Sequence, residues 1–157
     1  MKNTILLLAS CLLVIPASAS AADSKTYSPV GCHSNQDTLT NSFSRVYNSS
    51  STSSISATCP VINDSMGQPI TDSWARVYDS SASEDICCTI RSYSQSGPSV
   101  VGSWNTTCSS NEGEQVLNTG AVGGSGENRM YSMQCSLPPR EDGDRTYLFA
   151  YHVQEGN

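Results

Sequence analysis

Beyond its first 22 residues, this 157-residue chain lacks any long hydrophobic run. A membrane-spanning helix needs about 20 mostly apolar residues in succession, so the sequence predicts no span after residue 22. Basic residues are scarce as well, with eight Lys and Arg against 14 Asp and Glu. Nucleic acids and anionic membranes select clustered positive charge, so the composition argues against both as main partners.

Histidine is nearly absent too, and His33 and His152 lie at opposite ends of the chain. The cysteines include no Cys-x-x-Cys pair. Structural zinc sites need ligands of these types at short, regular spacing, so we expect neither a metal nor a cofactor. One acidic turn, Glu141-Asp142-Gly143-Asp144, has clustered oxygens of the kind that Ca²⁺ binds, but it lacks the ligand spacing of an EF-hand.

Catalytic motifs are missing from the sequence. No Gly-x-Ser-x-Gly elbow precedes a helix signal, and the glycine-rich stretch 120–126 lacks the Gly-Lys-Ser/Thr ending of a phosphate loop. A nucleophilic cysteine would have to stay reduced beside a base, which no local context provides. We therefore name no catalytic residue and predict a non-enzymatic protein.

The N-terminal segment 1–22 reads as a signal peptide. Lys2 precedes a mostly apolar stretch at 5–15, and small residues follow Pro16, as a cleavage site requires. Leu8-Ala9-Ser10-Cys11 resembles a bacterial lipobox, but the apolar run continues past Cys11, so we favour cleavage near residues 20–23 over lipidation. The remaining chain, 23–157, has the size of one domain. Without Lys2 its net charge is 7 − 14 = −7.

Six cysteines remain after the signal peptide, and an even number behind such a segment indicates three disulfides. The sequence thus predicts a secreted or periplasmic protein. These cysteines are Cys32, Cys59, Cys87, Cys88, Cys108 and Cys135.

The domain reads as all-β, because apolar residues alternate with polar ones over short stretches and no helical period is convincing. Turn residues separate the stretches. We predict an antiparallel β-sandwich, jelly-roll-like or Ig-like, of seven or eight short strands. The main segments are 41–48, 55–62, 72–79, 85–93, 99–108, 115–122, 129–137 and 146–153. The last one is apolar on both sides, which predicts a central strand. Strict alternation would place Tyr147, Phe149, Tyr151 and Val153 on one face and Leu148 and Ala150 on the other.

An internal repeat organises the first half of the domain. Residues 41–58 and 72–89 align with a shift of 31 positions, and eight of the 18 aligned pairs are identical. A period in this range indicates a repeated supersecondary unit. Each copy contains two alternating stretches around a serine-rich turn, so we interpret each as a β-hairpin.

The direction of the side chains predicts the disulfide pairs. Neighbouring residues on a strand point to opposite faces, so Cys88 should face the core and Cys87 the outside. Cys135 also falls on a core face, and we expect it to meet Cys88 across the sandwich. The predicted pairs are Cys32–Cys59, Cys87–Cys108 and Cys88–Cys135.

Both copies of the repeat place an aromatic residue, an arginine and a tyrosine on one strand face. If the two strands are close, these side chains form a surface that stacks on sugar rings or peptide groups while arginine donates hydrogen bonds. The structural alternative is that the arginine stems cover the rings internally. The candidate binding residues are Phe43, Arg45, Tyr47, Trp74, Arg76 and Tyr78.

Several short phrases together resemble a group of small secreted bacterial proteins whose function is not characterised. They are Cys59-Pro60-Val61, Val77-Tyr78-Asp79, Cys88-Thr89-Ile90, Cys135-Ser136-Leu137-Pro138 and a terminal Tyr151-His152-Val153-Gln154-Glu155. The resemblance implies an exported bacterial domain and transfers no catalytic residue.

Two non-enzymatic functions fit these observations; a third alternative, an enzyme, would require a site assembled from residues that lie far apart in the sequence. The first is an exported binding module for a polysaccharide or a secreted protein. The second is an inhibitor of a secreted protease or glycosidase, which would present a rigid loop to a cleft, and 96–99 and 136–140 are the loops that suit this role.

Overall fold

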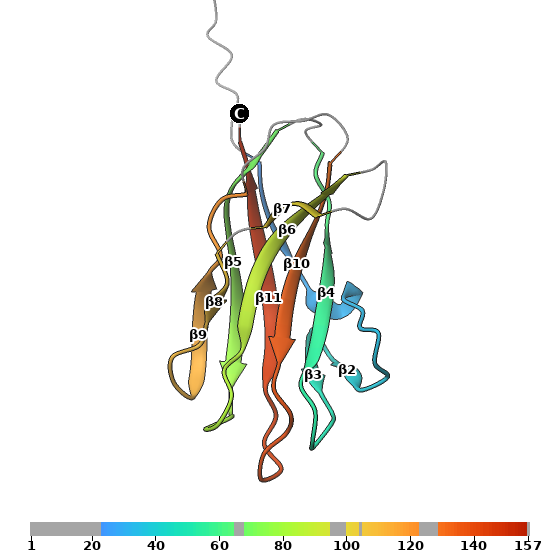
Figure 1. Cartoon of the computed structure of the whole chain (residues 1–157), viewed down its shortest axis with the longest axis vertical. Helices are drawn as coiled ribbons and strands as arrows, with labels where there is room; N and C mark the ends of the chain where they lie inside the picture. Colours follow the sequence, from blue (N-terminus) through green and yellow to red (C-terminus); the bar gives the residue numbers. More distant parts are fainter. Residues whose placement is uncertain (1–22, 65–67, 95–99, 104, 123–128, 157) are drawn as a thin grey trace, which may run out of the picture.

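A computed structural model describes residues 23–64, 68–94, 100–103, 105–122 and 129–156 (Figure 1). The predicted signal peptide, with Cys11, lies outside the described residues. So do the loop 96–99 and the second half of the glycine-rich stretch, 123–126. Within the described ranges, no helix has the length and apolar character needed to cross a membrane.

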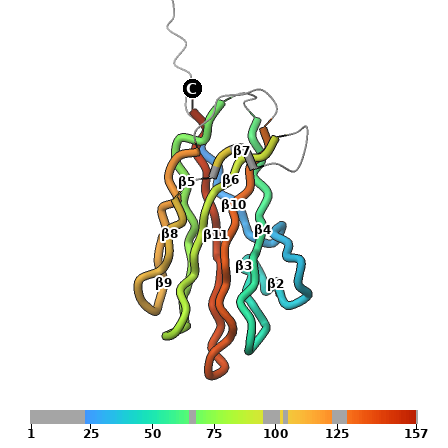
Figure 2. The backbone as a smooth tube through the Cα atoms, in the orientation of Figure 1, coloured from blue at the N-terminus to red at the C-terminus, as the bar shows by residue number. Residues whose placement is uncertain are grey.

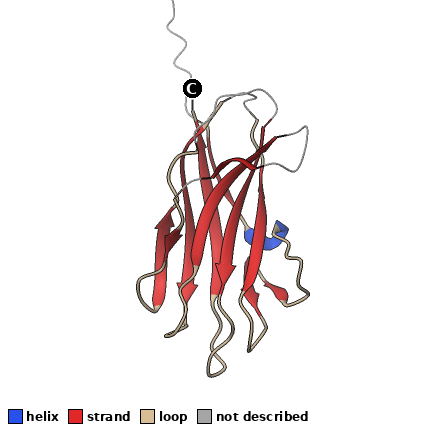
Figure 3. Cartoon of the chain, viewed as in Figure 1, coloured by secondary structure: helices blue, strands red, loops and turns tan. Residues whose placement is uncertain are grey.

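The described chain forms two antiparallel sheets packed as a sandwich (Figure 3). β1 (Ser24–Tyr27) pairs with β11 at the side of the larger sheet. The order of the other strands in this six-stranded sheet is β2 (Leu39–Ser42), β3 (Arg45–Asn48), β11 (Tyr147–Glu155), β5 (Ile70–Asp79) and β9 (Gly113–Asn118).

The second sheet has five strands, and a short 3₁₀ helix (Pro29–Gly31) lies before Cys32. β8 (Thr107–Cys108) pairs with β6. The order of the other four strands is β4 (Ile55–Val61), β10 (Arg129–Leu137), β6 (Cys87–Ser94) and β7 (Val100–Ser103).

The predicted all-β sandwich is confirmed, with eleven strands in the described residues instead of seven or eight. Two of the expected strands are each split in two. The segment 41–48 contains the second half of β2 and all of β3, and the segment 99–108 contains β7 and β8.

The repeat is not a pair of hairpins. In the first copy β3 lies in the six-stranded sheet and β4 in the five-stranded one, and in the second copy β5 and β6 are divided in the same way. Each copy is therefore an arch that carries the chain from one sheet to the other, at the lower end of the sandwich in Figure 2. Hairpins and arches have the same alternation and the same serine-rich turn, so the sequence pattern alone did not separate them.

The two arches share one hydrogen-bond scheme. Asn48 and Asp79 occupy equivalent positions, and each side chain accepts a bond from the backbone N–H two residues on, at 2.9 and 3.0 Å. Ser50 Oγ then accepts from the N–H groups of residues 52 and 53, as Ser81 Oγ does from those of residues 83 and 84. Serine and Asx side chains thus satisfy backbone donors where the chain leaves a sheet.

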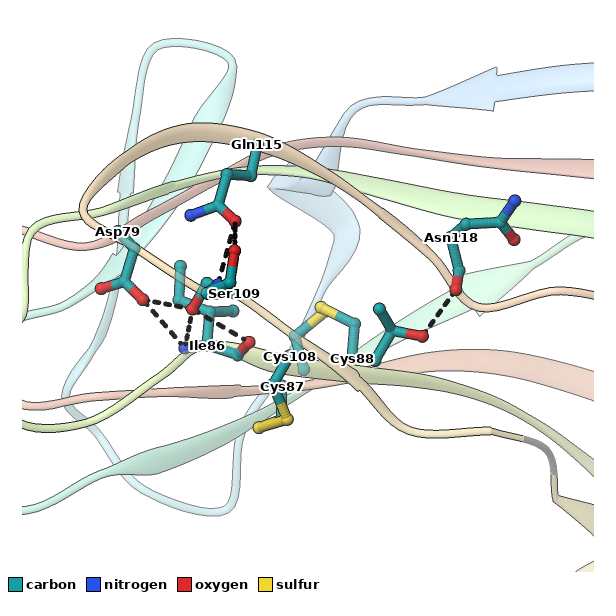
Figure 4. The surroundings of a disulfide bond; sticks show 11 residues. Asp79, Ile86, Cys87, Cys88, Cys108, Ser109, Gln115 and Asn118 are labelled. Atoms are coloured by element: carbon teal, nitrogen blue, oxygen red, sulfur yellow. Dashed lines mark hydrogen bonds between the residues drawn. A yellow bond between two sulfur atoms is a disulfide. The ribbon is translucent and has the colours of Figure 1, made fainter.

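The two arches differ in the groups that face Asn48 and Asp79. The Asn48 amide donates to the carbonyl oxygens of Ser53, Leu137 and Pro138 at 2.7, 3.1 and 3.0 Å. Asp79 faces donors instead: its carboxylate accepts from Ile86 N–H at 3.2 Å and from the Ser109 hydroxyl (Figure 4). Both side chains are only 1 % exposed. An amide is placed where acceptors need a donor, and a carboxylate where donors need an acceptor.

The segment 41–48 was predicted as one strand, and this is wrong. It turns at Phe43 and Ser44, and β2 pairs with β3 across this turn. Phe43 has a φ of 57° and its side chain is 96 % exposed. Two-residue hairpins favour positive φ at the turn, and the Phe43 side chain lies in solvent instead of in the core.

The three disulfides are the pairs expected from the sequence: Cys32–Cys59, Cys87–Cys108 and Cys88–Cys135. The expectation that Cys88–Cys135 connects the two sheets is wrong. Cys88 and Cys135 are opposite residues on adjacent strands of one sheet, with Cα atoms 4.1 Å apart, and do not bridge the sandwich. Cys87 pairs in the same manner with Cys108 (Figure 4). A position opposite on a neighbouring strand brings two inward-facing cysteines as close as a position on the facing sheet.

β11 is the central strand of the larger sheet, as its apolar character on both sides predicted. Its expected faces are wrong. A bulge lies between Leu148 and Ala150, and it adds Phe149 to the outer side while Tyr151 and Val153 turn into the core. A bulge inserts one residue and reverses the alternation beyond it, which a strict period of two does not reveal.

The two ends of the domain are joined by a polar contact. Lys25 Nζ lies 2.9 Å from Asp23, 3.0 Å from Asp64 and 2.6 Å from the buried carboxylate of Glu155. Burial opposes the lysine charge, but the three carboxylates outweigh it and raise the pKa of Lys25 above its ordinary value. This contact fixes β1 against the end of β11.

Exchanging the two arch residues tests this account of the fold. Asn48→Asp would place a carboxylate against three carbonyl oxygens, and Asp79→Asn would remove a charged acceptor from buried donors. We expect each to lower the free energy of unfolding by about 2–4 kcal/mol. Asn41→Asp, at an exposed position of β2, is the control and should change it by less than about 0.5 kcal/mol. Denaturant unfolding with intact disulfides measures all three, and losses equal to the control would contradict the arch scheme.

Alkaline pH provides a second test. Tyr151 is buried, stacks on Tyr27 at 5.0 Å and donates to Pro60 O at 2.6 Å. Burial raises the pKa of Tyr151 from 10.0 to about 12. Below pH 10 this tyrosine is neutral in both states, so its contribution to stability is complete. Between pH 10 and 12 it ionises first in the unfolded chain, and stability falls.

Tyr151→Phe removes that ionisation. It should be less stable than the parent at pH 7, because it loses the hydrogen bond to Pro60, yet its melting temperature should fall less between pH 10 and 12. Melting followed by circular dichroism across this range measures the difference. Parallel curves for the two proteins would show that Tyr151 is not the group responsible.

Candidate functional site

The outer face of the six-stranded sheet carries the candidate site. The first strands of both arches, β3 and β5, lie on either side of β11 in this sheet. The register places Tyr47 opposite Tyr147, and Tyr147 opposite Tyr78. Ring centroids are 5.6 Å apart in the first pair and 6.4 Å in the second. Three tyrosines therefore form a row across three adjacent strands.

Phe149 extends this row along β11. Its ring stacks on that of Tyr147, with centroids 5.9 Å apart and planes at 14°. It lies two residues after Tyr147, on the same outer side, and is the unpaired residue of the bulge in β11. Bulges are frequent near functional sites because they re-aim a side chain. We call Tyr47, Tyr147, Tyr78 and Phe149 the aromatic row.

Two arginines lie over the aromatic row. The Arg45 guanidinium is 4.3 Å from the centre of the Tyr147 ring and 6.0 Å from that of Phe149. Arg145, just before β11, lies 4.5 Å above the Tyr47 ring. Cation–π attraction of this kind contributes about 0.5–1 kcal/mol at a partly exposed position. The arginines therefore do cover aromatic rings of the sheet face, as the structural alternative predicted.

The third arginine of this face has an acidic partner. Arg76 on β5 forms an ion pair with Glu114 on β9, and the two side chains are 53 % and 49 % exposed. An exposed pair of this type adds little to stability. Tyr78, next to it on the same face, is 40 % exposed. The β5 side of the aromatic row is therefore the side most open to a ligand.

Trp74 occupies the other end of β5. It stacks on His152 of β11, with ring centroids 4.8 Å apart and planes at 7°. The histidine ring is held from its far side by Thr26 at 2.9 Å and by Ser24 at 3.3 Å, both in β1. Trp74 is half-buried. This pair stiffens the sheet beyond the aromatic row.

Five of the six candidate binding residues lie on the same face of the sheet. Arg45, Tyr47, Trp74, Arg76 and Tyr78 share the outer face, and Tyr47 is only 8 % exposed under Arg145. Phe43 is not among them, because it sits in the β2–β3 turn. That these residues bind a ligand stays a prediction.

Four residues of the face were missed: Arg145, Tyr147, Phe149 and His152. Their alternation was visible, but Tyr147 and Phe149 were assigned to the same side as Tyr151. The pairing of β11 with both arches also has no local signal in the sequence. Only the aromatic content of the last strand could have pointed to it.

A pocket lies beside the second arch. This pocket, of about 390 Å³, is lined mostly by polar residues of the second arch and of the loop before β9: Ser81, Ala82, Asp85, Ser110, Asn111 and Glu112. Among the described residues, no group of three or more His, Cys, Asp or Glu side chains could hold a metal ion.

The acidic turn at 141–144 has another use. The Glu141 carboxylate accepts from the Ser83 hydroxyl and from Ala82 N–H at 3.1 Å. The hydrogen bond from Ser83 and, to a smaller extent, the one from Ala82 hold the pKa of Glu141 below its usual value. The turn before β11 is thus attached to the second arch.

The suspected inhibitory loop 136–140 is attached as well. Pro138 is buried, and Arg140 N–H donates to Ser50 O of the first arch at 2.7 Å. The other suspected loop, 96–99, lies outside the described residues. The inhibitor interpretation stays a prediction.

Comparison with known proteins gives one structural likeness. No family model matches the chain, and no curated protein matches it. The chain is similar to a low-affinity xylan-binding module, CBM86, from the gut symbiont Roseburia intestinalis. Sequence identity is 10 % and the TM-score is 0.46, over 85 % of this chain and 96 % of that chain.

The contact between Arg45 and Tyr147 can be measured in a double-mutant cycle. Arg45→Ala, Tyr147→Ala and the double variant should give a coupling energy of about 0.5–1 kcal/mol in denaturant unfolding. Pairing Arg45→Ala with Tyr78→Ala is the control, and there we expect no coupling beyond about 0.3 kcal/mol. Equal coupling in both cycles would mean that Arg45 does not rest on Tyr147.

Proposed function

We propose that this protein is an exported, non-enzymatic binding module that holds a polysaccharide on the outer face of its six-stranded sheet. The observation that carries the proposal is the aromatic row: four rings on three adjacent strands, flanked by arginines. Such a row on the outside of a sandwich contributes nothing to the core between the sheets. Tyr78 is 40 % exposed, and Tyr147 and Phe149 are partly exposed, so part of the ring surface is open to a ligand.

A polysaccharide suits the chemistry of this face. The ring of a sugar presents C–H groups on its faces and hydroxyls at its edge. Aromatic rings take the C–H faces, and the tyrosine hydroxyls and arginine N–H groups are suited to the edges. Strands in a sheet are about 4.8 Å apart, so the row from β3 to β5 is about 10 Å wide. An extended chain can lie along it and contact consecutive sugar rings.

Export is supported by the disulfides. All six cysteines after residue 22 are paired, and such bonds persist in oxidising compartments. The N-terminal segment 1–22 has the features of a signal peptide. A polysaccharide of a cell wall or of the surroundings is a partner that an exported domain meets.

Tyr78→Ala tests the proposal, because Tyr78 is the most exposed tyrosine of the row. We expect binding to weaken about five- to tenfold. Affinity electrophoresis in gels that contain xylan, mannan, a β-glucan or polygalacturonate measures it. Met130→Ala is the control, since Met130 is 52 % exposed on the other sheet, and it should bind like the parent.

The binding results distinguish a wrong function from a wrongly placed binding surface. No retention of the parent protein by any polysaccharide in the panel would overturn the proposed function. Equal weakening by Tyr78→Ala and Met130→Ala would place the binding surface elsewhere. Melting curves of both variants establish that the fold is retained.

A further inference from the structure

Two arginines of the binding face have aromatic rings as partners and, among the described residues, no acidic one. Arg45 lies over Tyr147 and Arg145 over Tyr47. Within the residues that the structure describes, neither forms an ion pair or a side-chain hydrogen bond. Both side chains are partly exposed. They differ in this from Arg76, whose charge is matched by Glu114.

An aromatic ring cannot accept hydrogen bonds from all the N–H donors of a guanidinium group. The ring attracts its positive charge, but the five N–H donors lie in the guanidinium plane and need acceptors. Stacking also restricts the side chain, so less rotamer freedom is lost when a ligand is bound. Arg45 and Arg145 are therefore pre-positioned donors with free hydrogen-bonding capacity.

The register places these two arginines on opposite sides of one tyrosine pair. Arg45 is two residues before Tyr47, and Arg145 two residues before Tyr147, on strands that run antiparallel with the tyrosines opposite each other. The two guanidinium groups thus flank the Tyr47–Tyr147 pair from both directions along the strands. Among the described residues, these two positive charges have no ion-pair partner, on a chain of net charge −6.

A carboxylate fits this arrangement better than a hydroxyl does. It accepts two parallel N–H bonds from one guanidinium and carries the opposite charge. A neutral sugar offers single hydroxyls and leaves the two charges unmatched. We infer that the polysaccharide bound by this face contains uronic acids, whose carboxylates are taken by Arg45 and Arg145. This inference rests on the proposed function.

The test compares acidic and neutral chains. Polygalacturonate and alginate supply uronic acids, xylan without acidic branches and mannan are neutral, and dextran sulfate carries sulfate in place of carboxylate. We expect the parent protein to bind the uronic acid polymers at least tenfold more tightly than the neutral ones in affinity electrophoresis and calorimetry. Methyl-esterified polygalacturonate, which keeps the sugar and loses the charge, should bind like a neutral chain.

Variants assign the effect to the two arginines. Arg45→Gln and Arg145→Gln should each weaken uronic acid binding about tenfold or more, while binding to neutral chains changes little. Arg45→Lys keeps the charge but loses the two-pronged donor, so we expect it to recover only part of the affinity. Arg129→Gln changes the net charge equally on the other sheet and serves as control. Melting curves show whether each variant is folded.

Three results would overturn the inference. They are equal binding of neutral and uronic acid chains, preference for dextran sulfate without binding to polygalacturonate, and equal losses in Arg45→Gln and Arg129→Gln. In the first two cases the binding module itself stands. Only failure to bind every polysaccharide would remove the proposed function together with the inference.

Discussion

The structure depends on the satisfaction of backbone polar groups where the chain crosses from one sheet to the other. Crossing removes the chain from both ladders, and buried N–H and C=O groups left unpaired are costly. Asn48 and Asp79 meet this need at equivalent positions of the repeat, each with a serine two residues on. The repeated sequence is therefore a repeated solution to one hydrogen-bonding problem, and its serines are part of that solution.

Because both arches cross in the same direction, their first strands enter one sheet and their second strands the other. The last strand, β11, then fills the gap between β3 and β5. This topology brings the arginines and tyrosines of the two copies to one face and adds Tyr147 and Phe149 between them. The outer face that carries the aromatic row is thus a consequence of the crossing geometry.

Local rules predicted the sandwich, the inward and outward cysteines and the pairs that they form. They failed where two arrangements share a pattern. An arch has the same alternation as a hairpin, and Cys88 and Cys135 can meet across a sheet or across a sandwich with both facing inward. Phe149 was placed on one face with Tyr151 because nothing in the sequence marks the bulge between them. Strand pairing between distant segments decides all three, and it has no signal in a single sequence.

Internal stacking and ligand binding are often treated as alternatives for an arginine on an aromatic sheet face. In the function proposed for this protein they act together. The Tyr147 and Tyr47 rings hold Arg45 and Arg145 in place through the charge, and the in-plane N–H donors are left over because a ring cannot accept them all. A flexible lysine at either position would have to be ordered by the ligand itself. In the proposed function, the stacking that stabilises the free protein therefore also prepares the face for a planar, charged group.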